Sequence, residues 1–446
     1  MADIMRSAHA QEETPRWDEA DLVRRLCHAL DIAKLAVEQL APNGYVSETL
    51  PEKNVRPEKV LCETSILLLH ASSVAGAAEV QARVRPLAEL LIPYARSERM
   101  LLGLCLEPSV AWDYALPHVC LQRLGYPDPQ FDYLLSQSVE SQAHSGRERA
   151  PHRMLEQEWI ARGWHDSKGT RGSPGTQTAR ISILNHSMDL FGGTRDDIYA
   201  FTHALMYVTD FNFEPSPLPR PRSMILAEAE ALLARCLDDQ DYDLAGEVLL
   251  SWPLTGESWS AGAAFAFHVL ARVEDKAGFL PTAGTRISEL SSLEEAERTK
   301  YFVATIYHTA YVMGLLCAAS LRPGFAPPAS IPITSAQGGS ARQILELLDR
   351  GPQRAHWRDE FDDLPEPQAD ALSGFLINIG LRRRIAGRDF AGLHELLKLV
   401  YELDLADTPA ASQAAEILER ITAFGKIAGD SQRHPARQVS SPAIEG

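Results

Sequence analysis

Four polar side chains recur at helical spacing within an otherwise apolar stretch. Tyr199, His203, Tyr207 and Asp210 follow one another at steps of four, four and three residues, so a helix over 199–211 would carry them on one face. A histidine and a carboxylate that lie close together shift each other's pKa, as general acid–base catalysis requires. The spacing predicts His203 as a catalytic acid or base, Asp210 as its partner, and both tyrosines as substrate-binding groups. The alternative is a polar seam in the core, in which a buried histidine donates to a backbone carbonyl or a tyrosine hydroxyl.

A second apolar stretch carries a similar set of polar residues. Thr305 and His308 would share one face of a helix, with Tyr311 on the adjacent face. If the two helices face each other across a helical array, His308 and Tyr311 oppose His203 as a catalytic acid or oxyanion donor, and Thr305 binds substrate. Internal hydrogen bonding is again the alternative. Two further residues complete the predicted substrate-binding set: His186 and Trp259.

The familiar ligand and cofactor motifs are missing from this sequence. His203 and Asp210 are seven positions apart, too far to chelate one ion from an undistorted helix, and no two of the six cysteines form a Cys-x-x-Cys pair. There is no Gly-x-Gly-x-x-Gly, no Walker loop and no Gly-x-Ser-x-Gly. The sequence therefore predicts no metal site and leaves any cofactor unknown. One acidic run is interpreted as a solvated turn: Asp238-Asp239-Gln240-Asp241-Tyr242-Asp243.

Composition and charge exclude several classes of partner. The 446 residues are 45% hydrophobic and 23% charged, which is ordinary for a soluble globular protein. The formal net charge of −17 disfavours binding to nucleic acid or to an anionic membrane surface. No basic start followed by an apolar segment is visible at the N-terminus, and no apolar run reaches the length of a membrane span. We expect a cytoplasmic protein.

The elements that must position these residues are helices. Alternating β-branched runs are nearly absent, and helical segments follow one another between prolines and glycines. Residues 223–252 and 371–404 each suggest two helices joined by a similar short turn, as in helical hairpins. The sequence predicts an all-α fold, a helical-hairpin array that forms an (α/α) toroid or a solenoid.

The chain length predicts more than one unit, since a single core rarely grows this large. We expect an N-terminal helical region over 15–160, a main helical array over 181–428 and a disordered tail over 429–446. A stretch over 163–180, rich in glycine and polar residues, is expected to be a flexible connection or a substrate lid.

Two blocks of the sequence resemble an uncharacterised domain family that is common in actinobacteria. The first block has the pattern Tyr199-x-x-Thr202-His203-x-x-x-Tyr207-x-Thr209-Asp210-Phe211. The second block is Ala304-Thr305-Ile306-Tyr307-His308-Thr309. The resemblance covers roughly residues 180–325 and has an all-helical character similar to that of α/α-toroid enzymes, such as terpenoid cyclases and lanthionine synthetases. It implies that His203, Asp210 and His308 are the residues of interest, and it implies no particular activity.

These observations together favour an enzyme. We expect a protein of specialised metabolism that performs an acid–base isomerisation, cyclisation or dehydration on a small-molecule or peptide substrate in a helix-lined cavity. The alternative is a non-catalytic helical-repeat module that binds a protein partner or a second copy of itself. A polar cavity that contains both His203 and His308 would favour the enzyme.

Overall fold

The computed structural model of the protein describes residues 18–40, 56–167, 176–213, 216–282, 285, 290, 292–333, 340–348 and 355–433. Within these ranges the regular structure consists of helices, with no β-strand, which confirms the predicted all-α class. The helices pack around a continuous apolar core that includes residues from α2 at one end of the described chain to α22 at the other.

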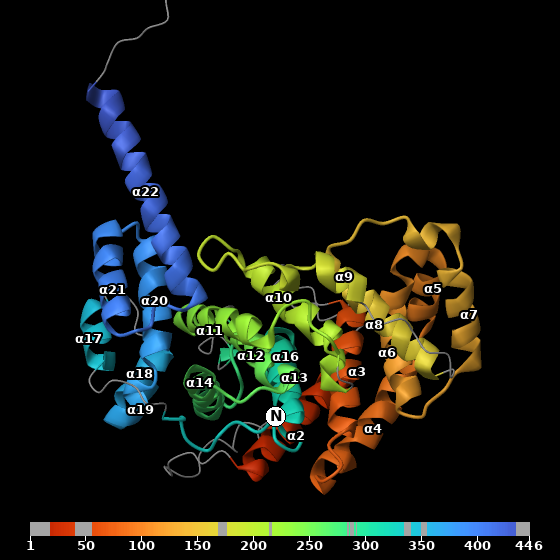
Figure 1. Ribbon diagram of the computed structural model, residues 1–446. Coiled ribbons are helices and arrows are strands. Elements are labelled where there is room, and N and C mark those ends of the chain that lie inside the picture. Colours follow the sequence, from red (N-terminus) through yellow and green to blue (C-terminus); the bar gives the residue numbers. More distant parts are fainter. Residues whose placement is uncertain are drawn as a thin grey trace, which may run out of the picture.

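The N-terminal helices are α2 (Glu19–Glu38), α3 (Pro57–Ser72), α4 (Ala78–Ala95), α5 (Glu98–Leu106), α6 (Ala111–Arg123), α7 (Pro129–Val139) and α8 (Pro151–Ser167), with short 3-10 helices η1 (Pro108–Val110) and η2 (Gln142–Ser145). The middle of the chain forms α9 (Thr176–Ile181), η3 (Ile183–Asn185), α10 (Arg195–Val208), η4 (Asp210–Asn212), α11 (Arg222–Asp238), α12 (Tyr242–Leu249), α13 (Ser251–Thr255), α14 (Ala261–Ala277) and α16 (Glu295–Ser320). The C-terminal helices are α17 (Ser340–Leu347), α18 (His356–Asp362), α19 (Glu366–Asp370), α20 (Ser373–Ala386), α21 (Phe390–Glu402) and α22 (Pro409–Arg433). In Figure 1 helices α4–α8 and the C-terminal helices lie at opposite ends of the molecule, α2 lies between them beside α16, and α22 projects from the body.

Helix α16 lies at the centre of the fold. It packs against α2, α3, α12 and α13. Its approach to α2 and α3 is close, because a Cβ at Gly314 would lie 2.6 Å from the Cβ of Ala29 and 2.8 Å from Leu67 Cδ1. The helix is long and apolar enough to cross a membrane, but 83% of its apolar window is buried inside the protein, as expected of a core helix. Through α16 the two predicted regions, 15–160 and 181–428, share one buried core.

Two helical hairpins have the turn that the sequence suggested. α11 leads into α12, and α20 leads into α21, through a residue in the left-handed conformation, Gln240 and Arg388, each with a φ of 55°. The next residue caps the following helix: Asp241 accepts from the backbone N–H of Leu244, and Asp389 accepts from that of Gly392. The two hairpins are neighbours, because α11 packs against α20.

Helix α10 begins as predicted and ends earlier than predicted. A capping box at its start pairs Thr194 with Asp197. The helix ends at Val208, and the next turn contains three consecutive residues with positive φ: Asp210, Phe211 and Asn212, at 51°, 49° and 61°. The predicted helix over 199–211 is therefore wrong in its last turn, and Asp210 does not continue the face that carries His203.

Helices occupy parts of two segments that the sequence predicts to be irregular. Helix α8 runs through Ser167 and α9 begins at Thr176, so both ends of the predicted loop over 163–180 are helical, and residues 168–175 lie outside the described residues. Helix α22 extends to Arg433, and residues 434–446 of the predicted tail lie outside the described residues.

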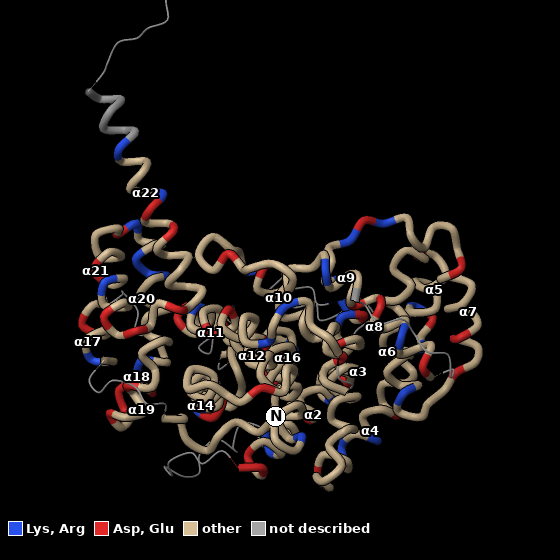
Figure 2. The backbone as a smooth tube through the Cα atoms, viewed as in Figure 1, with Lys and Arg blue, Asp and Glu red and all other residues tan. Residues whose placement is uncertain are grey.

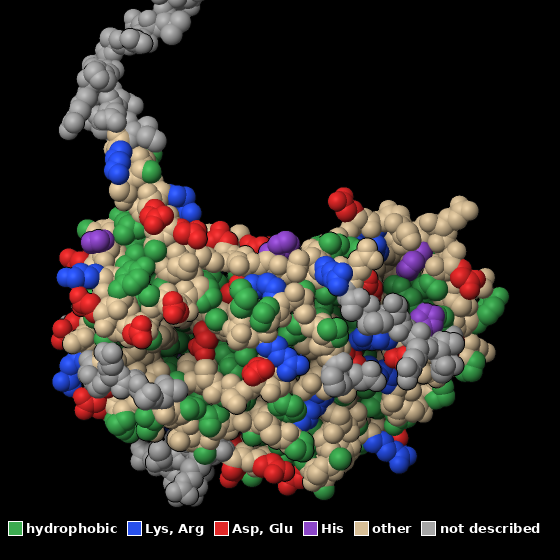
Figure 3. All heavy atoms as spheres, in the orientation of Figure 1, with side chains coloured by type: hydrophobic (Ala, Val, Ile, Leu, Met, Phe, Trp, Pro, Cys, Tyr) green, Lys and Arg blue, Asp and Glu red, His purple; other side chains and the backbone are tan. Residues whose placement is uncertain are grey.

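Charged residues of both signs are distributed along the helices (Figure 2). On the face shown in Figure 3, acidic and basic side chains are interspersed with apolar ones.

Candidate functional site

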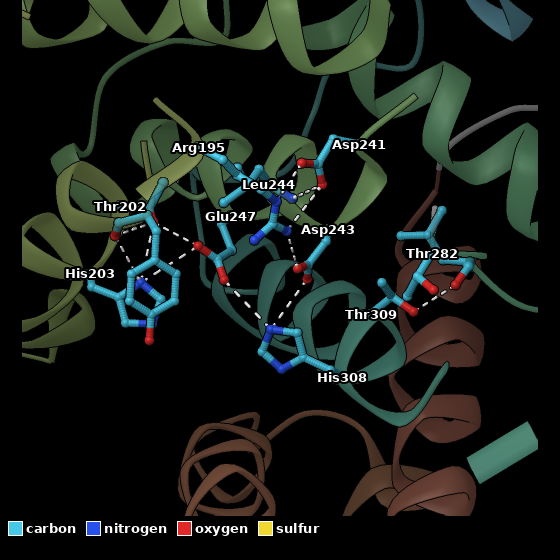
Figure 4. A network of polar contacts seen from close by, with 12 residues as sticks. Arg195, Thr202, His203, Asp241, Asp243, Leu244, Glu247, Thr282, His308 and Thr309 are labelled. Carbon is cyan, nitrogen blue, oxygen red and sulfur yellow. Dashed lines mark hydrogen bonds and ion pairs between the residues drawn. The ribbon is translucent and has the colours of Figure 1, made fainter. Parts of the chain in front are cut away.

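A histidine on the central helix lies among three carboxylates. His308 of α16 donates from Nδ1 to Oε2 of Glu63 on α3, at 3.0 Å. Its other ring nitrogen, Nε2, lies 3.2 Å from Asp243 Oδ1 and 3.7 Å from Glu247 Oε1, both on α12. Figure 4 shows the two α12 carboxylates pointing toward the imidazole from one side. We call Glu63, His203, Asp243, Glu247 and His308 the His308 centre.

Local structure explains why the α12 carboxylates share a face. Asp243 and Glu247 are four residues apart, so they lie one above the other on the helix. Gly246, between them, allows α12 to approach α16 closely, since a Cβ at this position would lie 2.6 Å from Val312 Cγ1. Val312 is one helical turn beyond His308. The close approach therefore brings both carboxylates to the imidazole.

Glu247 also contacts the second predicted histidine. Its Oε2 accepts a hydrogen bond from Thr202 Oγ1 at 2.6 Å and lies 3.5 Å from His203 Nδ1. One carboxylate thus contacts both His203 and His308, and its side chain is only 2% exposed. The structure brings the two predicted histidines into one site.

The ring orientation of His203 is set by its own helix. Nδ1 donates to the Tyr199 carbonyl at 3.0 Å, and the Tyr199 ring stacks on the imidazole with centroids 3.7 Å apart. Among the described residues Nε2 has no hydrogen-bond partner. Because Nδ1 carries the proton in this arrangement, the neutral ring presents an unprotonated Nε2 that can accept one.

The α12 and α16 side chains of the centre have further partners. Arg195 donates to Asp243 Oδ2 at 2.8 Å and also to Asp241 Oδ2 at 2.8 Å. Asp243 Oδ1, the atom that faces His308, is buried and has no hydrogen-bond partner among the described residues. The ring of His308 is oriented by Glu63, and Glu247 is held by Thr202.

Burial and neighbouring charges shift the pKa values in opposite directions. Burial lowers the pKa of His308, but Glu63, Asp243 and Glu247 together raise it well above its usual range. Burial raises the pKa of Glu63, yet His308 lowers it below normal. Burial also raises the pKa of Glu247, and His203 and His308 bring it below its ordinary value. The pKa of Asp243 is raised, because burial and the Glu247 charge outweigh its cationic neighbours.

A second polar network lies beside the centre and contains both predicted tyrosines. Arg153 donates to the Tyr199 hydroxyl at 3.0 Å and to Glu156 Oε2 at 2.7 Å. Tyr207 donates to Glu156 Oε1 at 2.8 Å. Burial raises the pKa of both phenols, so each remains a neutral hydrogen-bonding group.

Asp210 is not the partner of His203. Its Oδ1 accepts from Trp159 Nε1 at 2.6 Å and lies 3.3 Å from an Arg162 nitrogen. The left-handed conformation at Asp210 interrupts the helical spacing on which the predicted pair depended. Among the described residues the ion-pair partner of His203 is Glu247.

The other predicted residues have hydrogen-bond partners outside the His308 centre, or are exposed. Tyr311 is buried and hydrogen-bonds with Thr64 at 2.8 Å, and Thr305 donates to the Tyr301 carbonyl of its own helix at 2.8 Å. Trp259 donates to the Phe325 carbonyl at 2.9 Å and stacks on Trp252, so it belongs to the core. His186 is exposed at the end of η3.

Three acidic residues of the centre were missed in the sequence: Glu63, Asp243 and Glu247. The spacing of Asp243 and Glu247 on one helix was a readable signal, because i and i+4 residues share a face. The interpretation of Asp243 as part of a solvated turn was wrong: it lies in the first turn of α12 with 16% of its side chain exposed. Asp238 of the same run pairs with Arg383 of α20. Glu63 had no readable signal, since only the packing of α3 on α16 brings it to His308.

The centre is reachable from solvent to a limited extent. One quarter of the His308 side chain is exposed, and 13% of that of His203. A separate surface cavity of about 210 Å³ is lined by Thr209, Asn212 and Arg222, among others.

Residues 26–318 match the model of a family described as "Domain of unknown function (DUF6895)". This span includes every residue of the His308 centre. No curated protein and no solved structure matches the chain. The expected relation to an uncharacterised family is thereby confirmed, while the particular signature and the actinobacterial source stay predictions.

Proposed function

Because the chain belongs to this family of unknown function, we propose its activity from the site itself: an enzyme that performs acid–base chemistry at the His308 centre. His203 is the proton-transfer group and Glu247 is its carboxylate partner. The observation that carries the proposal is the contact of one buried carboxylate with two histidines from different helices. Isolated core histidines are satisfied by one backbone or hydroxyl contact, and this arrangement has more charge than core packing requires.

The geometry of His203 supports its role as a base. With Nδ1 donating to the Tyr199 carbonyl, Nε2 is the nitrogen that accepts a proton from a substrate C–H or O–H. The Glu247 carboxylate, 3.5 Å from Nδ1, stabilises the imidazolium that results. His203 then returns the proton to another atom of the substrate, so that the reaction is an isomerisation, a cyclisation or a dehydration.

The surroundings of His203 favour a substrate of modest size. The imidazole stacks on the Tyr199 ring, and the Tyr199 hydroxyl accepts from Arg153 of the network that also contains Glu156 and Tyr207. These neighbours offer both hydrogen-bonding groups and aromatic surface. A small molecule or a short peptide segment of a natural-product pathway fits this combination. A cytoplasmic location agrees with the same proposal, since such substrates are made inside the cell.

A protein-binding role is the second candidate, and it is supported by the C-terminal helices. Helix α22 projects from the body (Figure 1), and Phe424 on it is 67% exposed. Tyr401 on α21 is 64% exposed. Exposed aromatic side chains on neighbouring helices suit a protein partner or a second copy of the chain.

The acid–base proposal can be tested without a known substrate. Purified protein is incubated with a metabolite and peptide extract of the source organism in D₂O, and high-resolution mass spectrometry records new masses and deuterium incorporation. We expect the wild type to change at least one component, and deuterium enters the product where the proton held by the His203 imidazolium exchanges with D₂O before it is returned to the substrate. His203→Gln should reduce that rate by about 100-fold or more, in line with the contribution of a general base.

The matched control is His394→Gln, since His394 is an exposed histidine on α21. It should leave the rate unchanged. Equal rates for His203→Gln and the wild type, with both proteins folded, would contradict the proposal, as would an extract that the wild type leaves untouched.

A further inference from the structure

We infer that Asp243, Glu247 and His308 form a binding site for one divalent first-row transition-metal ion. The three candidate ligand atoms are Asp243 Oδ1, Glu247 Oε1 and His308 Nε2, and each lies within 4.8 Å of the others. They come from two helices, α12 and α16, that the close approach at Gly246 holds together. The site goes beyond the proposed function, which requires no metal.

The separations between the histidine and each carboxylate are close to those in a coordination sphere. With metal–ligand bonds of about 2.1 Å, neighbouring ligand atoms are separated by about 3.0 Å in octahedral and about 3.4 Å in tetrahedral geometry. His308 Nε2 lies 3.2 Å from Asp243 Oδ1 and 3.7 Å from Glu247 Oε1. These two separations differ from the ideal values by a few tenths of an ångström, and the Asp243 and Glu247 ligand atoms lie within 4.8 Å of each other.

Each ligand has a partner that orients it. Metal-bound histidines generally donate their other nitrogen to a carboxylate or carbonyl, and metal-bound carboxylates are hydrogen-bonded in turn. His308 Nδ1 donates to Glu63, Thr202 donates to the far oxygen of Glu247, and Arg195 donates to the far oxygen of Asp243. None of these three contacts uses the inward-facing atoms, and the proton on His308 Nε2 is released to solvent when a cation binds there.

One inward-facing atom has an ion-pair contact but no hydrogen bond. Asp243 Oδ1 is buried and has no hydrogen-bond partner among the described residues, and its charged neighbour is His308 Nε2 at 3.2 Å. A buried carboxylate oxygen without a hydrogen bond is costly. A cation between Asp243, Glu247 and His308 would bind to Asp243 Oδ1. It would also reduce the electrostatic repulsion between the Asp243 and Glu247 carboxylates.

The donor set indicates the class of ion. Imidazole nitrogen favours zinc and its first-row neighbours, while carboxylates also accept manganese. Three protein ligands leave at least one position for water or substrate, which is typical of catalytic sites and not of closed structural ones. We therefore expect an exchangeable Zn²⁺, Mn²⁺ or similar ion with an open coordination position. Such an ion would bind Oε1 of Glu247, whereas His203 lies near Oε2 of the same carboxylate.

The test measures metal binding in the absence of any substrate. Chelator-treated full-length protein is dialysed separately against Zn²⁺ and Mn²⁺, and bound metal is quantified by elemental mass spectrometry. Co²⁺ serves as a spectroscopic probe, because its visible absorption reports nitrogen and carboxylate coordination. We expect about one ion per chain and an increase in thermal stability that rises with metal concentration.

Variants at the site distinguish specific from surface binding. Asp243→Asn and His308→Gln should each lower the affinity by at least about 100-fold, whereas Glu63→Gln, which alters only the orienting contact, should lower it by about 10- to 100-fold. Glu395→Gln changes an exposed carboxylate on α21 and should have no effect. Because a variant could fail to fold, circular dichroism of each metal-free protein is recorded alongside.

Two results would overturn the site. One is a wild-type protein that binds no more metal than a control protein that lacks these three ligands. The other is stoichiometric binding that survives unchanged in folded Asp243→Asn and His308→Gln. In either case the centre is a protonated His308 held by its carboxylates, with no metal. Neither result bears on the deuterium-incorporation test of His203, so the two proposals can fail separately.

Discussion

Glu247 couples the two histidines through a single carboxylate. Its Oε2 faces Thr202 and His203, and its Oε1 faces His308. In a side chain that is 2% exposed, the negative charge is poorly screened by water. A cation bound beside Oε1 therefore weakens the attraction of Oε2 for an imidazolium at His203. Metal binding and proton transfer at this centre are thus expected to influence each other.

A different histidine should make the fold sensitive to acid. His70 is 1% exposed, contacts Phe211 and Phe213, and donates to the Ile66 carbonyl. Burial, with added repulsion from Arg322 and Arg123, lowers its pKa to about 3. The unfolded chain, with a histidine pKa near 6.5, binds the proton first, so the stability contributed by neutral His70 is complete above pH 6.5 and is lost as the pH falls toward 3.

We predict that the free energy of unfolding loses about 1.4 kcal/mol per pH unit from this residue within that window. His70→Gln keeps a neutral hydrogen-bonding group and removes the titration. Chemical denaturation between about pH 7 and about pH 4.5 should show a shallower pH dependence for His70→Gln than for the wild type. His394→Gln should keep the wild-type slope, because that side chain is exposed. Parallel slopes for His70→Gln and the wild type would rule out this role.

Residues within one helix were easier to predict than their partners. The four-residue step from Tyr199 to His203 correctly placed both on one face, and they stack. Asp210 was misplaced because the chain leaves the helix after Val208 for a left-handed turn, which tertiary contacts such as Trp159 to Asp210 hold in place. Helical periodicity contains no information about those contacts.

At the scale of elements, the packing of α12 on α16 decides whether the His308 centre exists. α12 has eight residues, too few to be stable alone, so its position depends on its neighbours. The turn before it was predictable, because Asp241 and Asp389 occupy equivalent capping positions in the two hairpins. The helix that α12 faces was not predictable, since that depends on shape complementarity between segments far apart in the chain.

Gly246→Ala tests the close approach of these two helices. The new Cβ would lie 2.6 Å from Val312 Cγ1, so α12 must move away from α16. We expect a loss of about 1–3 kcal/mol in the free energy of unfolding, as for other overpacked cores. Val312→Ala removes the clashing atom, and in the double variant the cost of Gly246→Ala should largely disappear.

The matched control is Gly374→Ala on α20, where a Cβ would have no neighbour within 4 Å. This change should be neutral or stabilise the protein by up to about 1 kcal/mol, because alanine is the better helix former. Additive effects of Gly246→Ala and Val312→Ala would show that the two helices do not constrain each other there.

At the scale of the molecule, the N-terminal helices complete the core of the middle segment. α2 and α3 cover α16, and α3 supplies Glu63 to the His308 centre. The all-α class was predictable from the absence of strand patterns and from the Pro and Gly positions. The association of α2 with α16 was not, because both helices are apolar on several faces and the pattern does not say which faces meet.

A buried arginine joins these distant parts of the chain and provides the corresponding test. Arg25 on α2 is 1% exposed and pairs with Glu274 on α14, with Asp275 on the same helix at 2.8 Å, and with Asp21 on α2 at 3.0 Å. Arg25→Met leaves the largely buried Glu274 without this partner, and we expect a loss of about 3–5 kcal/mol in the free energy of unfolding. Its neighbour Arg24 pairs with Asp21 and Asp275 but is 52% exposed, so Arg24→Met should cost less than about 1 kcal/mol.

Thermal unfolding followed by far-ultraviolet circular dichroism and by tryptophan fluorescence distinguishes a shared core from separate units. Because α2 is packed on α16 and tied to Glu274, destabilisation at Arg25 should lower the midpoint of both signals together. A variant in which only part of the helical signal is lost at lower temperature would mean that the N-terminal helices unfold on their own. Equal costs for Arg24→Met and Arg25→Met would likewise contradict the burial argument, since the two arginines share Asp21 and Asp275, and only Arg25 is buried and pairs with Glu274.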